Sequence, residues 1–233
     1  MMKRLIVLTA AILAIGAPAI AAPKPPAAPA SVAIRDGDVV YTGADGVAQT
    51  LTSGGDYTGA ALSPDGKTAA FIHVDGPPIP AGGAGNAPPT SLWVADVPGG
   101  APRQVIGSRS SDDMQQIFVS YAGPSFSIDG AVVYVTADAW ATSGAVHAVT
   151  LATGEEHYVI DGGLKGVIRT GRFRGDLLVT RHLYHPAPQY GAYEPTFVIS
   201  PDGKQVLMVP DSDKDDGVDY VTPWLAKNHW KAS

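Results

Sequence analysis

The chain has 233 residues, 45% of them hydrophobic, and is therefore long enough to bury a core of its own. It contains no cysteine, which excludes disulfides, thiolate metal sites and catalysis by a thiol. Charged residues make up 16% of the sequence and the formal net charge is -6, a balance that argues against nucleic acid and anionic lipid as partners.

Residues 1–21 are typical of an export signal. Lys3 and Arg4 precede an apolar stretch, Leu5–Ile15, that is too short to span a bilayer, and small residues suited to signal peptidase follow at 19–21. We therefore expect a periplasmic or secreted bacterial protein with no stable membrane insertion after cleavage. The alternative is an uncleaved membrane anchor.

Three further parts follow the signal. Residues 22–36 are rich in proline and alanine and are expected to form an extended leader, because proline disfavours helix in the residue before it. Residues 37–226 are expected to form one β-rich domain, since 27 glycines and 20 prolines favour strands joined by tight turns over long helices. Residues 227–233 would form a short C-terminal tail.

Two kinds of β-hairpin alternate along the predicted domain. The first kind joins strongly apolar strands through a short turn rich in aspartate and glycine, in which glycine adopts the positive φ of a tight turn. These inner hairpins are expected at Tyr57–Val74, Phe118–Ala137 and Val167–His182. The second kind is more polar, and these outer hairpins begin at Asp38, Ser91, Gly144 and Tyr193.

An inner hairpin followed by an outer one makes a four-stranded antiparallel unit of roughly fifty residues, and radial repetition of such units is typical of a β-propeller. The segments LSPDGKTAAFIH (Leu62–His73) and SLWVADVPGGAPRQV (Ser91–Val105) together resemble the WD40-like repeat of TolB-like periplasmic propellers. The same repeat occurs in the propeller domains of prolyl oligopeptidase and dipeptidyl peptidase relatives. The resemblance covers Asp38–Val209 and implies a fold, with no specificity for an activity.

The expected fold class is all-β, a small β-propeller of four-stranded antiparallel blades with room for about four blades. A closed ring of four blades, an open or partial propeller, and closure through a second copy are the alternatives. We favour the closed ring, because unpaired blades would expose apolar strands to water. In that ring Val218–Ala226 would supply part of the inner hairpin that is otherwise missing.

The metal-ligand patterns in the sequence are incomplete. Asp211, Asp213 and Asp215 alternate as in a calcium loop, but the glycine falls one position late and no glutamate closes the loop, which favours a solvated acidic turn over calcium. His182 and His185 lie three positions apart, so on a continuing strand they would point to opposite faces. We therefore expect no metal and no cofactor, the alternative being histidines that meet across a central channel.

No catalytic residue is assigned from the sequence. There is no G-x-S-x-G elbow, and Glu155 and Glu156, at the start of an outer strand, are expected to face solvent. Paired carboxylates gathered from several blades at one end of the axis are the alternative.

Two long insertions are expected to form a binding surface on one face of the disc. They are Asp75–Thr90 and Leu183–Pro195, each joining an inner hairpin to the outer hairpin that follows. Aromatic side chains on loops held by a rigid scaffold commonly recognise partners. The predicted partner-binding residues are Trp140, His182, Tyr184, His185, Tyr190 and Tyr193. In the alternative, the insertions fold over the end of the propeller and cap it.

These patterns predict an exported, non-enzymatic β-propeller that binds a protein or peptide in the cell envelope. One alternative is an enzyme that uses the propeller channel, such as a lyase or hydrolase dependent on a metal or on carboxylates. Another is an accessory relative of the peptidase propellers. No pattern in the sequence specifies the ligand or the oligomeric state.

Overall fold

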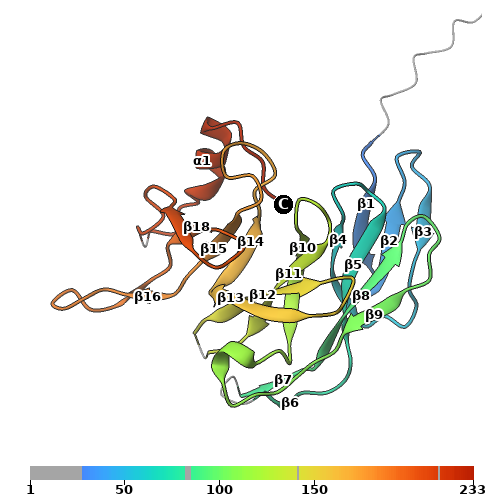
Figure 1. Cartoon of the computed structure of the whole chain (residues 1–233), viewed down its shortest axis with the longest axis horizontal. Helices are drawn as coiled ribbons and strands as arrows, with labels where there is room; N and C mark the ends of the chain where they lie inside the picture. Colours follow the sequence, from blue (N-terminus) through green and yellow to red (C-terminus); the bar gives the residue numbers. More distant parts are fainter. Residues whose placement is uncertain (1–27, 82–84, 141, 215) are drawn as a thin grey trace, which may run out of the picture.

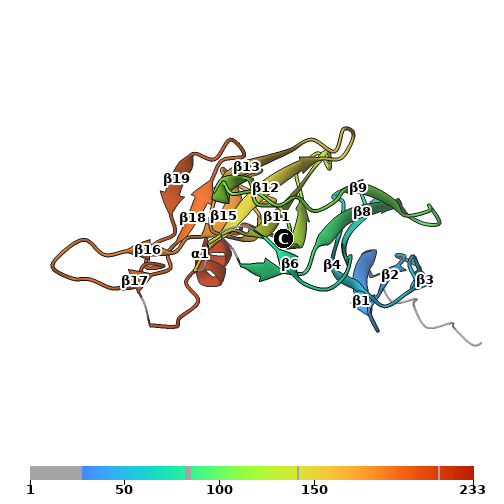
Figure 2. The same cartoon turned by 90° about the horizontal axis from the view of Figure 1, so that it is seen from below.

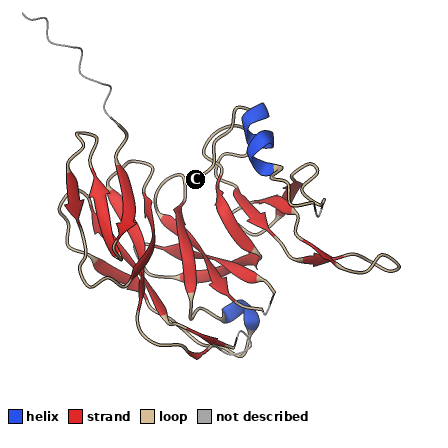
Figure 3. Cartoon of the chain, turned by 180° about the vertical axis from the view of Figure 1, so that it is seen from behind, coloured by secondary structure: helices blue, strands red, loops and turns tan. Residues whose placement is uncertain are grey.

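The computed structural model describes residues 28–81, 85–140, 142–214 and 216–233. The predicted export signal, residues 1–21, lies outside this part of the chain. Strands dominate the described residues, together with a short α-helix, α1 (Val221–Lys227), and a 3-10 turn, η2 (Met114–Gln116) (Figure 3). No helix among the described residues is long and apolar enough to span a bilayer.

Four main antiparallel sheets follow one another along the described chain. The first sheet has three strands: β1 (Ser31–Arg35), β2 (Asp38–Thr42) and β3 (Ala48–Thr50). The second sheet contains β4 (Tyr57–Leu62), β5 (Thr68–Val74), β8 (Thr90–Asp96) and β9 (Arg103–Ile106). The third sheet contains β10 (Tyr121–Phe126), β11 (Val132–Asp138), β12 (Gly144–Thr150) and β13 (Glu156–Asp161). The fourth sheet contains β14 (Gly163–Val167), β15 (Leu177–Thr180), β18 (Thr196–Ile199) and β19 (Gln205–Met208).

The four sheets lie side by side as the blades of an open propeller (Figure 1). Their innermost strands, β1, β4, β10 and β14, contact one another in that order. Apolar side chains fill each interface: Phe71 lies between the first two sheets, Phe126 between the second and third, and Leu177 between the third and fourth. The expected all-β fold with four-stranded antiparallel blades is confirmed.

The closed ring favoured by the sequence is wrong. Within the described residues no strand pairing joins the first sheet to the fourth, and Figures 1 and 2 show these two sheets at opposite ends of an arc. Val218–Ala226, expected to supply a strand, instead contributes most of α1. Ser31–Arg35, assigned to the leader from the sequence, forms β1 and pairs with β2. The first sheet therefore has one inner strand where the repeat would place two.

A serine and an aspartate shape the turn that the sequence repeats. Between β4 and β5 the Ser63 hydroxyl donates to the Asp65 carboxylate (2.7 Å) and accepts from the Thr68 backbone N–H (2.9 Å). Ser127 donates to Asp129 in the same way between β10 and β11 (2.6 Å), and the turn between β18 and β19 repeats the bond. This hydrogen bond from serine is the main cause that lowers the pKa of Asp65 and of Asp129. The recurring S-x-D-G sequence therefore specifies one local turn geometry.

The two ends of the arc are covered differently. The outward face of the first sheet exposes small or polar side chains, such as Arg35 on β1 and Thr50 on β3. The outward face of the fourth sheet is apolar around the buried Leu178 and Val198, which pack in one cluster with Trp224 of α1, and carries Thr180 and Thr196 farther along. The outward face of the first sheet can therefore face water, whereas the apolar part of the outward face of the fourth sheet needs the C-terminal segment as a cover.

The predicted C-terminal tail, residues 227–233, is part of the fold. The backbone N–H of Val167 donates to the Ser233 carbonyl oxygen (2.8 Å), and the N–H of Arg169 donates to that of Lys231 (2.7 Å), so the tail continues the inner edge of the fourth sheet. The Arg169 guanidinium also donates to the Phe126 carbonyl oxygen (2.8 Å) at the edge of the third sheet. Because the Ser125 hydroxyl of β10 also donates to the Ser233 carbonyl oxygen (2.8 Å), the tail ties the last two blades together.

The two long insertions behave differently. In the first, β6 (Ile79–Pro80) pairs with β7 (Asn86–Ala87), and buried apolar residues of this hairpin pack against Ile117 and Val119 beside η2. The first insertion therefore folds back against the blades, as in the alternative in which the insertions act as a cap. In the second, β16 (Leu183–Tyr184) pairs with β17 (Ala192–Tyr193), and this two-stranded arm projects away from the blades (Figure 2).

Candidate functional site

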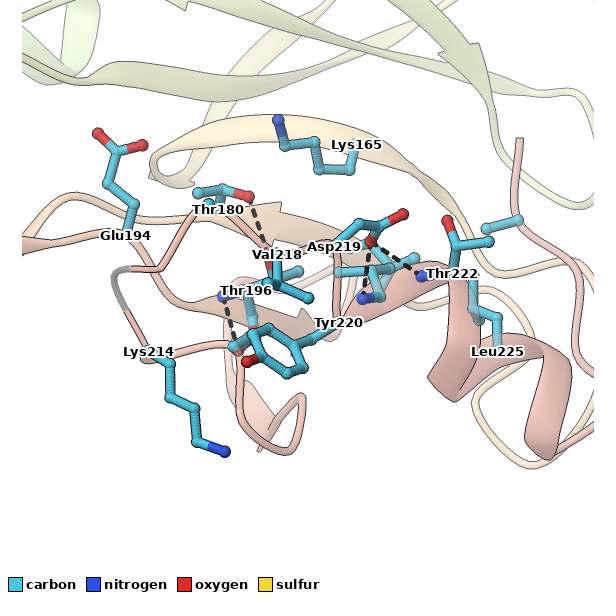
Figure 4. A pocket seen from close by; sticks show the side chains of 15 residues that line it. Lys165, Thr180, Glu194, Thr196, Lys214, Val218, Asp219, Tyr220, Thr222 and Leu225 are labelled. Carbon is cyan, nitrogen blue, oxygen red and sulfur yellow. Dashed lines mark hydrogen bonds between the residues drawn. The ribbon is translucent and has the colours of Figure 1, made fainter.

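A pocket of about 750 Å³ lies between the outward face of the fourth sheet and the C-terminal segment (Figure 4). Hydroxyl groups line its sheet side: the Thr180 and Thr196 hydroxyl oxygens are 3.0 Å apart, and the Ser212 hydroxyl accepts from the Thr196 backbone N–H (3.1 Å). Val221 and Leu225 of α1 supply apolar wall on the opposite side. A ligand here would meet hydrogen-bonding groups on one side and aliphatic groups on the other.

Charges of both signs surround this pocket. Figure 4 shows Glu194 and Lys214 at one end, Leu225 at the other, and Lys165 of β14 along one side. Lys214 is held by Asp211 (Nζ to Oδ1, 2.7 Å). Among the described residues no ion pair involves Lys165, so its ammonium group can meet an incoming anion.

Asp219 fixes the start of α1 at the edge of the pocket. Its Oδ1 accepts from the backbone N–H groups of Val221 (2.9 Å) and Thr222 (3.1 Å). The hydrogen bond from the Thr222 side chain, then those from the backbone, and finally the positive charge of Lys165 lower the pKa of Asp219. The carboxylate therefore stays ionised and satisfies N–H groups that have no partner inside the helix.

The large pocket continues into two smaller ones. A pocket of about 190 Å³ shares Lys165, Thr180 and Glu194 with it, and a third pocket of about 350 Å³ shares Thr142, Ser143 and His182 with the second. We call this continuous depression the C-terminal groove. It runs from α1, past the start of β14, to the side of the third sheet near β13. Its remaining principal side chains are Gln115, Trp140, Tyr158, Asp161, Tyr184, Thr196, Ser212, Asp219, Tyr220 and Leu225.

The structure places three of the six predicted partner-binding residues in the groove. Trp140, His182 and Tyr184 line the 350 Å³ pocket together. His185 and Tyr193 instead stack on each other along the arm, with ring centroids 4.2 Å apart. Tyr190 lies near the tip of the arm, where its side chain is 75% exposed. The six residues predicted to form one binding surface therefore form two groups, one in the groove and one along the arm.

Sequence reasoning missed the polar half of the groove. Lys165, Glu194 and Asp219 come from three separate segments, and Asp219 reaches the other two because the C-terminal segment folds back over the fourth sheet. A signal was present for one of them: Asp219 precedes Pro223 at the spacing of a helix start, where an aspartate cap and a proline in the first turn are both favoured. No local pattern marks Lys165 or Glu194.

A buried charged cluster corrects another expectation. Glu156, expected to face solvent, has a side chain only 2% exposed. It accepts hydrogen bonds from His147 Nδ1 (2.5 Å) and from Arg109 (2.5 Å). Burial alone would raise the pKa of Glu156, but these two hydrogen bonds outweigh it and lower the pKa.

The other ring nitrogen of His147 has no partner among the described residues. The ring is fully buried beside Phe118, at a centroid separation of 5.2 Å. Neither His147 nor Glu156 lines the groove. The pair of Glu156 and His147 therefore links β13 to β12, and neither side chain would contact a ligand bound in the groove.

The acidic run near α1 makes local contacts. Asp211 pairs with Lys214, and Asp216 accepts from the Tyr220 hydroxyl (2.6 Å). Asp215 lies outside the described residues. Within the described residues, no three histidine, cysteine, aspartate or glutamate side chains converge in a way that would hold a metal ion.

Comparisons with known proteins give similarity in structure only. No protein family model matches the chain, and no curated protein matches its sequence. The structure is similar to the β-propeller domain of the Trilobed protease from Pyrococcus furiosus, at 12% identity and a TM-score of 0.47 over 76% of this chain and 51% of that chain. It is similar to TolB from Acinetobacter baumannii, at 15% identity and a TM-score of 0.48 over 76% of this chain and 38% of that one. Dipeptidyl peptidase 4 from Porphyromonas gingivalis aligns at 11% identity and a TM-score of 0.49, over 78% of this chain and 31% of its own length. The chain thus spans about half or less of these proteins, and similarity at this level assigns no activity to it.

Proposed function

We propose that this protein is an exported binding module that holds an extended segment of a protein or peptide partner in the C-terminal groove. The observation that carries the proposal is the continuity of the groove, whose three pockets share walls from α1 to Tyr184. A continuous depression of this kind suits a chain-like ligand better than a compact one.

The chemistry of the groove supports a peptide as ligand. The hydroxyls of Thr180, Thr196 and Ser212 can exchange hydrogen bonds with backbone amides, while Lys165 and Glu194 offer charges of both signs. Aromatic rings at both ends, Tyr220 and Tyr184 among them, can hold apolar side chains. The export signal predicted at residues 1–21 supports an envelope location for that partner.

Site-directed photo-crosslinking in cells tests the proposal. A photoreactive phenylalanine analogue at position 194, where the Glu194 side chain is 65% exposed, should crosslink one discrete partner. The control position is Val47, which is 64% exposed and belongs to the turn between β2 and β3, strands at the opposite end of the arc. Adding Lys165→Trp, a change at an exposed β14 position that narrows the groove, should reduce the crosslinked product at position 194. Equal crosslinking at positions 194 and 47, or none at either, would contradict the proposal.

A further inference from the structure

One pocket of the groove has a distinct side-chain composition. Three aromatic rings line the 350 Å³ pocket: Trp140 from the loop between β11 and β12, Tyr158 from β13 and Tyr184 from the arm. The His182 ring lies edge-on to that of Tyr184, with centroids 5.1 Å apart. Tyr184 is 68% exposed, so its ring borders an open entrance. Aromatic residues therefore make up half of the lining of this pocket.

Negative charge is the only fixed charge on the described walls of this pocket. Asp161 lines it, and no lysine or arginine is among the described residues that do. Arg181 binds both oxygens of Asp161 from outside the pocket, through Nη2 to Oδ1 at 2.8 Å and to Oδ2 at 2.9 Å, which fixes the carboxylate in place and pairs its charge. Burial, followed by the negative charge of Asp161, raises the pKa of Tyr158, so this tyrosine stays neutral. The exposed Glu194, 3.3 Å from His182, adds a second carboxylate nearby.

We propose that this pocket binds an organic cation, namely the arginine or lysine side chain of the segment held in the C-terminal groove. The inference rests on the proposed function and adds the class of side chain recognised. Aromatic faces attract guanidinium and ammonium groups, and the exposed Glu194 carboxylate beside His182 can pair with the same charge. An anionic side chain would meet aromatic rings and no lysine or arginine on the described walls, and a neutral one would gain nothing from the negative charge nearby.

Binding of small probes to the full chain tests the inference directly. The probes are N-acetyl-arginine methylamide and the citrulline equivalent, which keeps the shape of arginine but carries no charge. The readout is the indole N–H signal of Trp140 in a nitrogen–proton correlation spectrum, assigned by Trp140→Phe. The arginine probe should shift this signal, and citrulline should bind at least about tenfold more weakly. Equal binding of the two probes would overturn the inference.

Two tyrosine variants on the same arm give a matched control. Tyr184→Ala should weaken the arginine probe by about fivefold to tenfold, whereas Tyr184→Phe should leave binding unchanged because the ring remains. Tyr190→Ala removes an equally exposed ring outside the pocket and should have no effect. Equal losses for Tyr184→Ala and Tyr190→Ala would contradict the assignment.

The crosslinking and probe experiments separate the two proposals. A discrete crosslinked partner at position 194 combined with no preference for arginine over citrulline would overturn the cation pocket and leave the proposed function standing. Selective arginine binding with no crosslinked partner would support the pocket and contradict a macromolecular ligand.

Discussion

Each end of the blade stack has a sheet face that no further blade covers, and the two faces differ in composition. At the N-terminal end, the three-stranded first sheet packs Phe71 and its neighbours on one face and shows small or polar side chains on the other. At the C-terminal end, the fourth sheet carries an apolar cluster on each face, and α1 and the tail cover the cluster on its outward side. The first sheet has a pocket of about 330 Å³ beside its β2–β3 turn, whereas the short helix over the fourth sheet leaves a pocket of about 750 Å³.

This difference explains why the C-terminal groove lies at the C-terminal end of the stack. An irregular cover cannot match the pleated surface of a sheet as closely as another sheet can, so space remains beneath it, and the hydroxyls of Thr180, Thr196 and Ser212 line that space. Lys165, Thr180 and Glu194 lie where the cover stops, and the arm that carries Tyr184 leaves the fourth sheet at the same place. The same structural need that calls for a cover therefore produces the groove.

The largest effect is expected on the free energy of unfolding, when one side chain is shortened at each end of the stack. Phe71 is fully buried between the first and second sheets, edge-on to Tyr57 at 5.6 Å, so Phe71→Ala should lower the free energy of unfolding by about 3–5 kcal/mol. Leu225→Ala removes a half-buried side chain from α1 and should cost only about 1 kcal/mol. Urea denaturation measures both. Equal losses would show that α1 is packed as tightly as the sheet interface.

Three glycine substitutions sharpen the contrast. All three residues have positive φ, which costs an alanine about 1–2 kcal/mol. At Gly46 (φ +82°) an added Cβ meets nothing within 4 Å, at Gly171 (φ +87°) it comes within 2.0 Å of the Trp230 indole, and at Gly37 (φ +81°) within 2.1 Å of the Gly55 carbonyl oxygen. We expect the loss of stability to rise from Gly46→Ala through Gly171→Ala to Gly37→Ala.

The reason for this order is what each Cβ meets. The backbone at Gly55 belongs to the segment that joins the first two sheets and moves less freely than a side chain, whereas the Trp230 side chain belongs to the cover and can swing out. Gly171→Ala should therefore change the tryptophan fluorescence of the folded protein, and Gly37→Ala should not. If Gly171→Ala cost as much as Gly37→Ala without a change in fluorescence, the cover would be as rigid as the sheets.

The repeat was predictable because its information is local. Ser63 and Asp65 form their turn through bonds within a few residues, so the sequence alone specifies the hairpins and, through their alternation, the four-stranded sheets. The closure of the ring depends on contacts between distant sheets and was predicted wrongly. Glu156 was misplaced for the same reason, because its partner Arg109 lies 47 positions away in the sequence.

The helix was missed because its residues favour a strand. Val221 and Thr222 are β-branched and follow a tyrosine, which is typical of a strand when read alone. Asp219 and the apolar face of the fourth sheet decide otherwise: the carboxylate caps the first turn, and Trp224 and Leu225 find an apolar surface to cover. The groove could not be predicted without that helix, and so half of its lining was missed.

The smallest effect should appear when the cover alone is loosened with acid. The pKa of Asp219 is lowered in the folded protein, so its stabilising contribution is complete above the ordinary aspartate pKa of about 3.9 and is lost as the pH falls through the lower folded value. Amide exchange at Val221 and Thr222, whose N–H groups bond to Asp219, should therefore speed up in that range while amides of β5 stay protected. Asp219→Asn should remove this pH dependence. A cover that is separable from the sheets must open before them. If the β5 amides became exposed at the same time, the cover and the blades would unfold as one unit.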